Sequence, residues 1–220
     1  LTEPQAGTDL AAIGTTATKT QSGWRLSGEK AWIVNAVAAD LIVTFAQTEP
    51  GSGAGGIAAF LVEATRPGWA RVPPPRRASP ASIGTGGFRL AGYHVQDDEI
   101  MLPPGTAFRA IINDINGAHT YMAAMCCGMV DAALRIVSEY GTRRETFGRT
   151  LSLHQGWRWT LAEAEVDLAA ARALVSEAVS KVETATECRH HAAQAKIFAT
   201  RMAQRHLPAL SQLMGAEDLR

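Results

Sequence analysis

The apolar pattern of this chain changes once, at Pro103-Pro104-Gly105. Before this point, apolar and β-branched residues form short runs separated by Gly, Ser and Pro, which is typical of strands joined by turns. Residues 71–80 carry Pro73-Pro74-Pro75, so we expect an extended loop there rather than the interior of a sheet. The spacing of the runs predicts a small β-barrel or β-sandwich, with strands at residues 13–20, 24–27, 41–46, 57–63 and 88–95.

After the break, apolar residues recur every three or four positions, which predicts helices at residues 106–140, 150–182 and 187–214. A helix of thirty residues is roughly 45 Å long, and long helices joined by short loops form an antiparallel bundle. We therefore predict an α+β protein, with a β-domain at 1–104 and a helical domain at 105–220. The side chains expected in the bundle core include Met122, Met125 and Met129 of the first helix, and Leu161, Ala164, Leu168, Ala171 and Val175 of the second.

Composition narrows the classes of partner. The formal net charge is zero and the isoelectric point is near 7.2, so the sequence favours neither nucleic acid nor an anionic membrane surface. We found no apolar run long enough to span a bilayer and no signal peptide. Three cysteines, of which Cys126 and Cys127 are adjacent, make neither a disulfide framework nor a metal site. We expect a reducing, cytoplasmic setting and no metal.

Two polar segments of the β-domain carry the first functional motif. The chain opens with Thr2-Glu3-Pro4-Gln5-Ala6-Gly7-Thr8-Asp9, and Trp32-Ile33-Val34 follows one hairpin later. Together they resemble the flavin-contacting signature of the acyl-CoA dehydrogenase family, Thr-Glu-Pro-x-Ala-Gly-Ser/Thr-Asp with Trp-Ile-Ser/Thr. The alternative is a polar loop whose Glu3 and Asp9 are solvated, with Trp32 in the core.

The resemblance assigns roles to single residues of these segments. It implies that Thr2 offers a hydroxyl and a backbone donor to the pyrimidine edge of the flavin, and that Trp32 packs beside the ring. Thr8 would face the acyl-CoA or the flavin phosphates. Val34 departs from the pattern, because valine has no hydroxyl to offer near the flavin N5. The cofactor-binding residues implied here are Thr2, Gly7, Thr8, Trp32, Ile33 and Val34.

Two further segments, in the helical domain, resemble FAD contacts that the family makes across a subunit interface. Arg143-Arg144-Glu145-Thr146-Phe147-Gly148, followed by Gln155, is similar to the family's Arg-x-x-Phe-Gly and later Gln. A guanidinium is suited to gripping pyrophosphate, and the implied residues are Arg144, Thr146, Phe147 and Gln155. The alternative is a helix end whose arginines oppose the dipole.

The last of these segments is Gln212-Leu213-Met214-Gly215-Ala216, which is similar to the family's Gln-x-x-Gly-Gly turn. It implies FAD contacts from Gln212 and Gly215, although Ala216 replaces the second glycine. An ordinary helix-ending glycine is the alternative for this segment.

On the substrate side the chain departs from the family. The family's first long helix carries Asp/Asn-x-x-Arg, which holds CoA, and here it reads Asn116-Gly117-Ala118-His119. Residues 82–87 also lack the usual Ser-Asp-Thr substrate loop. One of the two positions that the family uses for its catalytic Glu is occupied by Ala118, so no catalytic base is recognised. Asn116, His119 and Thr8 are the predicted substrate-binding residues.

The resemblance implies an FAD enzyme that oxidises an acyl-CoA thioester to the enoyl-CoA and passes electrons to an electron-transfer flavoprotein, as a homodimer or homotetramer. It covers the family's middle domain and most of its C-terminal helical domain. The N-terminal helical domain and the final helices would lie outside residues 1–220. The alternatives are a relative that acts on a non-CoA carrier or a nitroalkane-like substrate, and a non-catalytic subunit that holds flavin.

Overall fold

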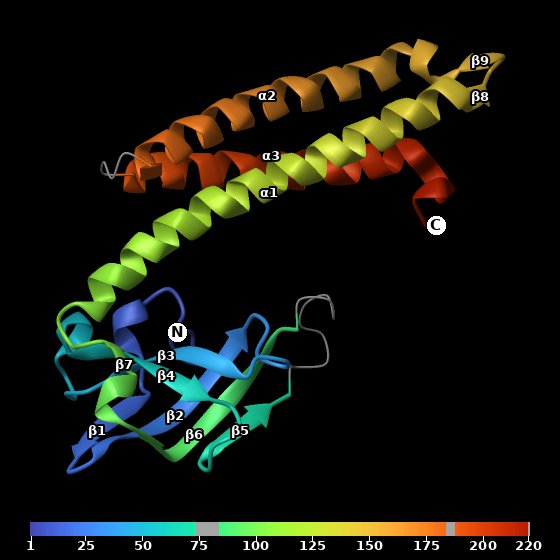
Figure 1. Ribbon diagram of the computed structural model, residues 1–220. Coiled ribbons are helices and arrows are strands. Elements are labelled where there is room, and N and C mark those ends of the chain that lie inside the picture. Colours follow the sequence, from blue (N-terminus) through green and yellow to red (C-terminus); the bar gives the residue numbers. More distant parts are fainter. Residues whose placement is uncertain (74–83, 184–187, 220) are drawn as a thin grey trace. The chain divides into compact units, whose positions relative to one another are not determined.

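The computed structural model describes residues 1–73, 84–183 and 188–219, which form two compact units, Leu1–Ile111 and Ile112–Arg220 (Figure 1). The first unit consists of strands and the second of helices, which confirms the predicted order of a β-domain followed by long helices. We describe each unit separately.

The β unit contains one seven-stranded sheet in the order β5-β6-β2-β1-β3-β4-β7. All of its neighbouring strands are antiparallel except β1 and β3, which pair in parallel at Thr16 and Gln47. The strands are β1 (Thr16–Thr20), β2 (Gly23–Ile33), β3 (Leu41–Gln47), β4 (Ile57–Glu63), β5 (Trp69–Val72), β6 (Gly86–Val95) and β7 (Ile100–Leu102).

The sheet curves around a single core. Phe60 of β4 and Phe88 of β6 share one buried cluster with Leu26 of β2, although β4 and β6 are not neighbours in the sheet. The hydroxyl of Tyr93 donates to the carbonyl of Glu63 at 3.2 Å and accepts the Glu63 N–H at 2.9 Å, so β6 is also tied to the end of β4. This curvature lets one sheet enclose its own apolar face.

Several predicted strand bounds were wrong. The first strand starts at Thr16 and not at residue 13, and the second is longer than predicted and continues through Trp32 to Ile33. Two short strands, β5 and β7, were missed. Both lie at the edges of the sheet and pair with a neighbouring strand on one side only. An edge strand can be short, and its sequence then shows little of the apolar alternation by which strands are predicted. Arg71 and Val72 therefore belong to a strand and not to the predicted loop, whose residues 74–80 lie outside the described part of the chain.

The helical unit consists of three long helices and a small hairpin. The helices are α1 (Ala107–Arg143), α2 (Gln155–Glu183) and α3 (Arg189–Met214), and the hairpin strands are β8 (Glu145–Thr146) and β9 (Arg149–Thr150). The second helix starts later than predicted because Leu151–Leu153 form a separate 3-10 turn, η5. The predicted start of the third helix at residue 187 lies outside the described residues.

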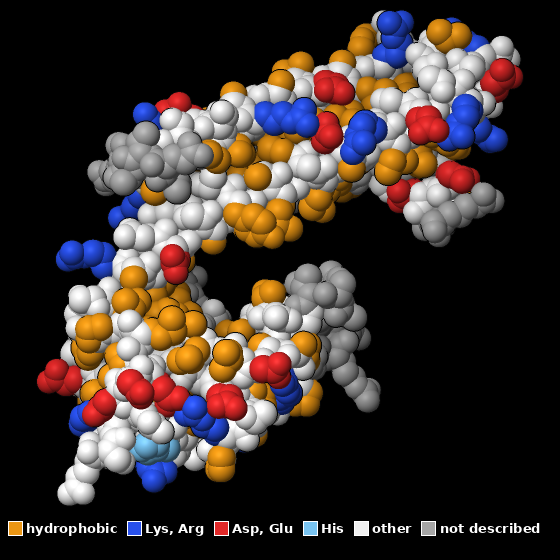
Figure 2. Space-filling view, viewed as in Figure 1, with side chains coloured by type: hydrophobic (Ala, Val, Ile, Leu, Met, Phe, Trp, Pro, Cys, Tyr) orange, Lys and Arg blue, Asp and Glu red, His pale blue; other side chains and the backbone are white. Residues whose placement is uncertain are grey.

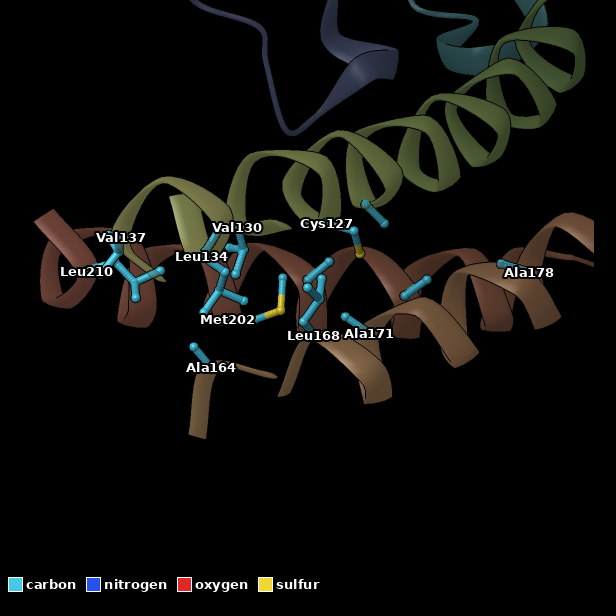
Figure 3. Packing of buried hydrophobic residues seen from close by; sticks show 14 of the residues in the cluster. Cys127, Val130, Leu134, Val137, Ala164, Leu168, Ala171, Ala178, Met202 and Leu210 are labelled. Carbon is cyan, nitrogen blue, oxygen red and sulfur yellow. The ribbon is translucent and has the colours of Figure 1, made fainter. Parts of the chain in front are cut away.

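The bundle core is built from one face of each helix (Figure 3). Leu168 and Ala171 of α2 are buried there as predicted, in one cluster with Val130 and Leu134 of α1 and Met202 of α3. The prediction that the α1 methionines lie in the core was wrong. The side of α1 that packs in the core carries Ala123, Cys127, Val130, Leu134 and Val137. Met122, Met125 and Met129 lie on the exposed side of α1, and hydrophobic side chains show on the surface of the helical unit in Figure 2.

The helix α1 also corrects our expectation about apolar length. One of its 18-residue windows has a mean hydropathy of 1.3, so by length and composition alone α1 could cross a membrane. One such helix is weak evidence, because a core helix of a soluble protein passes the same test. Its packing against α2 and α3 accounts for the apolar residues on one of its faces.

Candidate functional site

The opening loop of the chain is organised around the buried carboxylate of Glu3. Its Oε1 accepts hydrogen bonds from the Thr15 hydroxyl at 2.5 Å and the Thr15 N–H at 3.0 Å. Its Oε2 accepts from the Gly14 N–H and the Gln5 side chain, both at 2.6 Å. One side chain thus ties residue 3 to residues 14 and 15 and closes the loop that carries the Gly7-Thr8 motif.

The carboxylate of Glu3 is paired with the ammonium of Lys30 from β2. Lys30 Nζ lies 2.6 Å from Glu3 Oε1 and donates to the carbonyl of Leu1 at 3.0 Å, and both charged side chains are only 1% exposed. Burial would raise the pKa of Glu3, but the hydrogen bonds from Lys30 and Thr15 and the Lys30 charge hold that pKa below its usual value. Burial lowers the pKa of Lys30, and Glu3 offsets this only in part.

The second signature segment lies at the end of β2, directly after Lys30. The Ala31 N–H donates to the carbonyl of Thr2 at 3.0 Å, so this segment is bonded to the opening loop. Trp32 has a left-handed backbone with φ of 60° and its side chain is 53% exposed. A bulky residue rarely adopts this conformation, which is typical of functional sites where the surroundings impose it.

These observations contradict the alternative interpretation at two of its three residues. Glu3 is not solvated and Trp32 is not in the core, whereas Asp9 is exposed as that interpretation expected. The structure brings Thr2 next to the segment that holds Trp32, Ile33 and Val34, whereas Gly7 and Thr8 lie on the exposed outer part of the loop.

A groove of about 260 Å³ runs beside the Trp32 side chain, between the opening loop and the β5–β6 edge of the sheet. Pro4, Ala31, Trp32, Val72 and Pro73 give it a largely apolar lining. Gly87 of β6 lies so close to β2 that a Cβ would stand 2.4 Å from the Lys30 carbonyl. An exposed indole beside a largely apolar groove fits a planar heteroaromatic ring such as a flavin.

The second predicted cluster lies in the helical unit, on the hairpin between α1 and α2. Phe147 is 97% exposed and has a left-handed backbone with φ of 52°, followed by Gly148 with φ of 75°. His154 braces this turn, because its Nε2 lies 3.2 Å from the carbonyl and 3.3 Å from the hydroxyl of Thr146. The hairpin therefore presents an aromatic side chain to solvent in a backbone conformation that costs energy.

The two arginines at the end of α1 differ in their surroundings. Arg143 forms an ion pair with Glu139 at 3.3 Å. Arg144 is exposed, and no ion pair to it is found within the described part of the chain. Its backbone carbonyl accepts the Leu151 N–H at 2.8 Å, which anchors the base of the hairpin. This free guanidinium is available to an anion.

The third predicted segment ends α3. Gly215 has φ of 61° and its N–H donates to the carbonyl of Gln212, which confirms the helix-ending geometry. Gln212 is exposed. Since the three helices run antiparallel in order, the end of α1, the start of α2 at Gln155 and the end of α3 share one end of the bundle (Figure 1). The three helix ends therefore place Arg144, Gln155 and Gln212 toward the same end, while their contact with FAD stays a prediction.

The predicted substrate residues lie on α1. Asn116 is buried and its carbonyl accepts the Thr120 hydroxyl at 3.2 Å. Burial and the charge of Lys196 on α3 lower the pKa of His119, so its imidazole is neutral at pH 7. Of the predicted substrate loop, residues 82 and 83 lie outside the described residues, and Gly86 and Gly87 belong to β6.

Sequence reasoning assigned no role in these sites to Lys30 or His154. The ion pair could have been suspected from a lysine next to the Trp32 motif and a glutamate in the opening motif. The contact of His154 could have been suspected because it follows Thr146 by only eight residues. Among the described residues, no three His, Cys, Asp or Glu side chains come together as metal ligands.

Both parts of the chain match models of the family that its motifs resemble. Residues 1–91 match the family model "Acyl-CoA dehydrogenase, middle domain" and residues 106–219 match "Acyl-CoA dehydrogenase, C-terminal domain". The chain belongs to the acyl-CoA dehydrogenase family. Members of this family bind FAD.

Individual relatives agree with this assignment. An acyl-CoA dehydrogenase of Bacillus subtilis is 32% identical over 200 residues, which are 91% of this chain and 53% of that protein. The butyryl-CoA dehydrogenase of Megasphaera elsdenii is 31% identical, with a TM-score of 0.93 over 100% of this chain and 58% of that one. A chain from the electron transferring flavoprotein structure of Acidaminococcus fermentans is 29% identical, with a TM-score of 0.93 over the same shares. The chain spans about half the length of the curated relatives it matches.

Proposed function

We propose that this chain is part of an enzyme that oxidises an acyl-CoA thioester to the enoyl-CoA with FAD. The observation that carries the proposal is the bond between Ala31 and Thr2, which joins the two flavin motifs beside an exposed Trp32 in a chain of this family. The whole protein would work in the cytoplasm as a homodimer or homotetramer, and an electron-transfer flavoprotein would reoxidise it.

Bound FAD would supply the hydride acceptor for such a reaction. The residues of this chain bind and orient it. Thr2 would offer its hydroxyl and N–H to the ring edge, and the Trp32 indole would pack beside the ring and exclude water. Val34 has only its backbone N–H to offer, since its side chain neither donates nor accepts a hydrogen bond.

Removal of the substrate α-proton needs a base of suitable pKa, usually a carboxylate. Ala118 occupies one of the two positions that the family uses, so we propose that the base comes from a part of the protein outside these 220 residues. Substrate recognition on α1 would use Asn116 and the neutral imidazole of His119, which is a weaker partner for phosphate than a guanidinium.

The test is an anaerobic titration of the complete gene product with butyryl-CoA, followed by the visible flavin band. Loss of the oxidised band supports both bound flavin and acyl-CoA oxidation. A yellow protein that keeps its band with acyl-CoA thioesters of several chain lengths contradicts the proposed reaction, and a colourless protein that takes up no added FAD contradicts the cofactor.

The role of Arg144 is tested with a neighbour as the control. Arg144→Ala should weaken FAD binding by roughly 10- to 100-fold, which corresponds to the roughly 1.5–3 kcal/mol of a hydrogen bond to a charged group. Arg143→Ala removes a neighbouring exposed arginine that is already paired with Glu139, and should leave FAD binding unchanged. Equal FAD content in both variants would refute the role of Arg144.

A second candidate function follows from the substrate side of α1. His119 stands where the family has an arginine for CoA, so the enzyme would act on a non-CoA carrier or a nitroalkane-like substrate. With Ala118 in one of the base positions, a subunit that holds flavin without catalysis is the remaining alternative. His119→Arg distinguishes these candidates, because gain of acyl-CoA-dependent bleaching in that variant, absent in the parent, would favour the non-CoA carrier.

A further inference from the structure

The ion pair of Glu3 and Lys30 has no direct part in the proposed chemistry, and both side chains are withdrawn from solvent. Taking two charges out of water is expensive, and replacing such a pair with apolar residues is often neutral or stabilising. Stability alone therefore does not explain a buried pair at this place. Its position along the chain offers a reason.

The hydrogen bonds of the pair connect the opening loop to β2. Glu3 accepts five hydrogen bonds from four residues, so its carboxylate is fully used in one geometry. Lys30 adds a bond from β2 to the Leu1 carbonyl at 3.0 Å. The opening loop is thus bonded to the strand that ends in the second motif, over a sequence separation of 27 residues.

The two residues that would face the flavin lie next to this pair. Thr2 precedes Glu3, and Trp32 follows Lys30 by two residues. The Ala31 N–H, which donates to the Thr2 carbonyl, lies between them. The buried ion pair and this hydrogen bond therefore connect the two segments at adjacent positions, directly next to Thr2 and two residues before the left-handed backbone of Trp32.

We propose that Glu3 and Lys30 are the positioning residues of the flavin site, which hold Thr2 and Trp32 in register before the cofactor binds. This inference rests on the proposed function. Its physical basis is pre-organisation, since a loop that is ordered beforehand loses less conformational entropy on binding. Neither residue touches the ring, and both act through the backbone of their neighbours.

The first measurement is amide hydrogen exchange of the complete gene product without FAD. In Glu3→Gln, which keeps the size of the side chain and removes its charge, the amides of residues 2–15 and 31–34 should exchange faster. Val62→Ala is the matched control, because it removes buried volume from β4 of the same unit without touching these segments. It should leave exchange at these segments as in the parent.

The second measurement is FAD affinity and the visible absorption spectrum of the reconstituted protein. Glu3→Gln should bind FAD roughly tenfold more weakly and shift the flavin band, because the free energy of ordering the loop is now taken from binding. The double variant Glu3→Gln/Lys30→Met should regain stability, since no charge stays buried without a partner, but not the parent spectrum. Val62→Ala should bind FAD with the parent spectrum.

The two measurements separate the inference from the function on which it rests. Parent-like exchange in Glu3→Gln, or flavin changes of equal size in Val62→Ala, would overturn the positioning role. If the parent protein itself takes up no FAD, the proposed function fails, and exchange of the two segments still decides whether the pair holds them together.

Discussion

The close contact between Gly141 and Trp157 predicts that an alanine at position 141 destabilises the helical unit. Gly141 is a buried residue of α1, and a Cβ added there would lie 2.7 Å from Cζ2 and 2.8 Å from Cε2 of the Trp157 indole. Ordinary van der Waals contact begins near 3.4 Å. Trp157 is 5% exposed and contacts Tyr140, so its ring has little room to move away.

The expected magnitude is the difference of two terms. Overfilling a packed site costs about 1–3 kcal/mol, and the higher helix propensity of alanine returns about 1 kcal/mol. Gly141→Ala should therefore lower the free energy of unfolding of the helical unit by roughly 0–2 kcal/mol. Gly128 of the same helix is exposed and has no atom within 4 Å of its added Cβ. Gly128→Ala should raise stability by about 0.5–1 kcal/mol, since only the propensity term applies.

Urea denaturation followed by the far-ultraviolet helical signal, with tryptophan fluorescence as a second probe, measures both variants. The free energies of unfolding of the two variants should differ by about 0.5–3 kcal/mol in favour of Gly128→Ala. A Gly141→Ala protein as stable as Gly128→Ala would show that the α1–α2 contact is looser than described, and would refute the packing argument.

Three further predictions concern the core, the ion pair and the flavin wall. Leu168→Ala should cost about 2–5 kcal/mol of stability in urea melts, whereas Val166→Ala on the exposed face of α2 should stay within about 0.5 kcal/mol of the parent. The pKa of Glu3 is lowered in the folded state, so its contribution to stability is present above the unfolded pKa of roughly 4.3 and is lost as pH falls through the folded value. Acid unfolding of Glu3→Gln should therefore be less steep than that of the parent, and equal slopes would contradict the ionised pair. Trp32→Ala should shift the visible flavin band or loosen FAD, and an unchanged spectrum and affinity would exclude contact with the ring.

Long, strongly periodic elements could be predicted and weak ones could not. The stripe of α2 placed Leu168 and Ala171 in the core because a buried helix face repeats at a fixed period. The strands β5 and β7 were missed because edge strands pair on one side and need only three or four residues. The exposed position of the α1 methionines was also missed, since α1 carries apolar residues on two faces and periodicity does not say which one packs.

The candidate site shows the same division. The motifs around Thr2, Trp32 and Arg144 were recognisable because they are contiguous in sequence. Which of two adjacent arginines is free depended on the Glu139 partner, one helical turn away, whose contact only the structure shows. The sharp turn at Phe147 was likewise invisible, because a left-handed backbone at a non-glycine residue has no reliable sequence signal.

The sequence by itself determined the family of this protein, the change from strands to long helices near residue 105, and the segments that resemble flavin contacts. Each of these conclusions depends on residues that are neighbours in the sequence, so each can be drawn without knowing how the chain folds. Only the tertiary structure decided that Glu3 is buried against Lys30, 27 residues away, and that Trp32 is exposed beside a groove. Burial and pairing of distant residues depend on how strands cross in space, and a charged side chain has the same letter whether it lies in water or beneath a sheet.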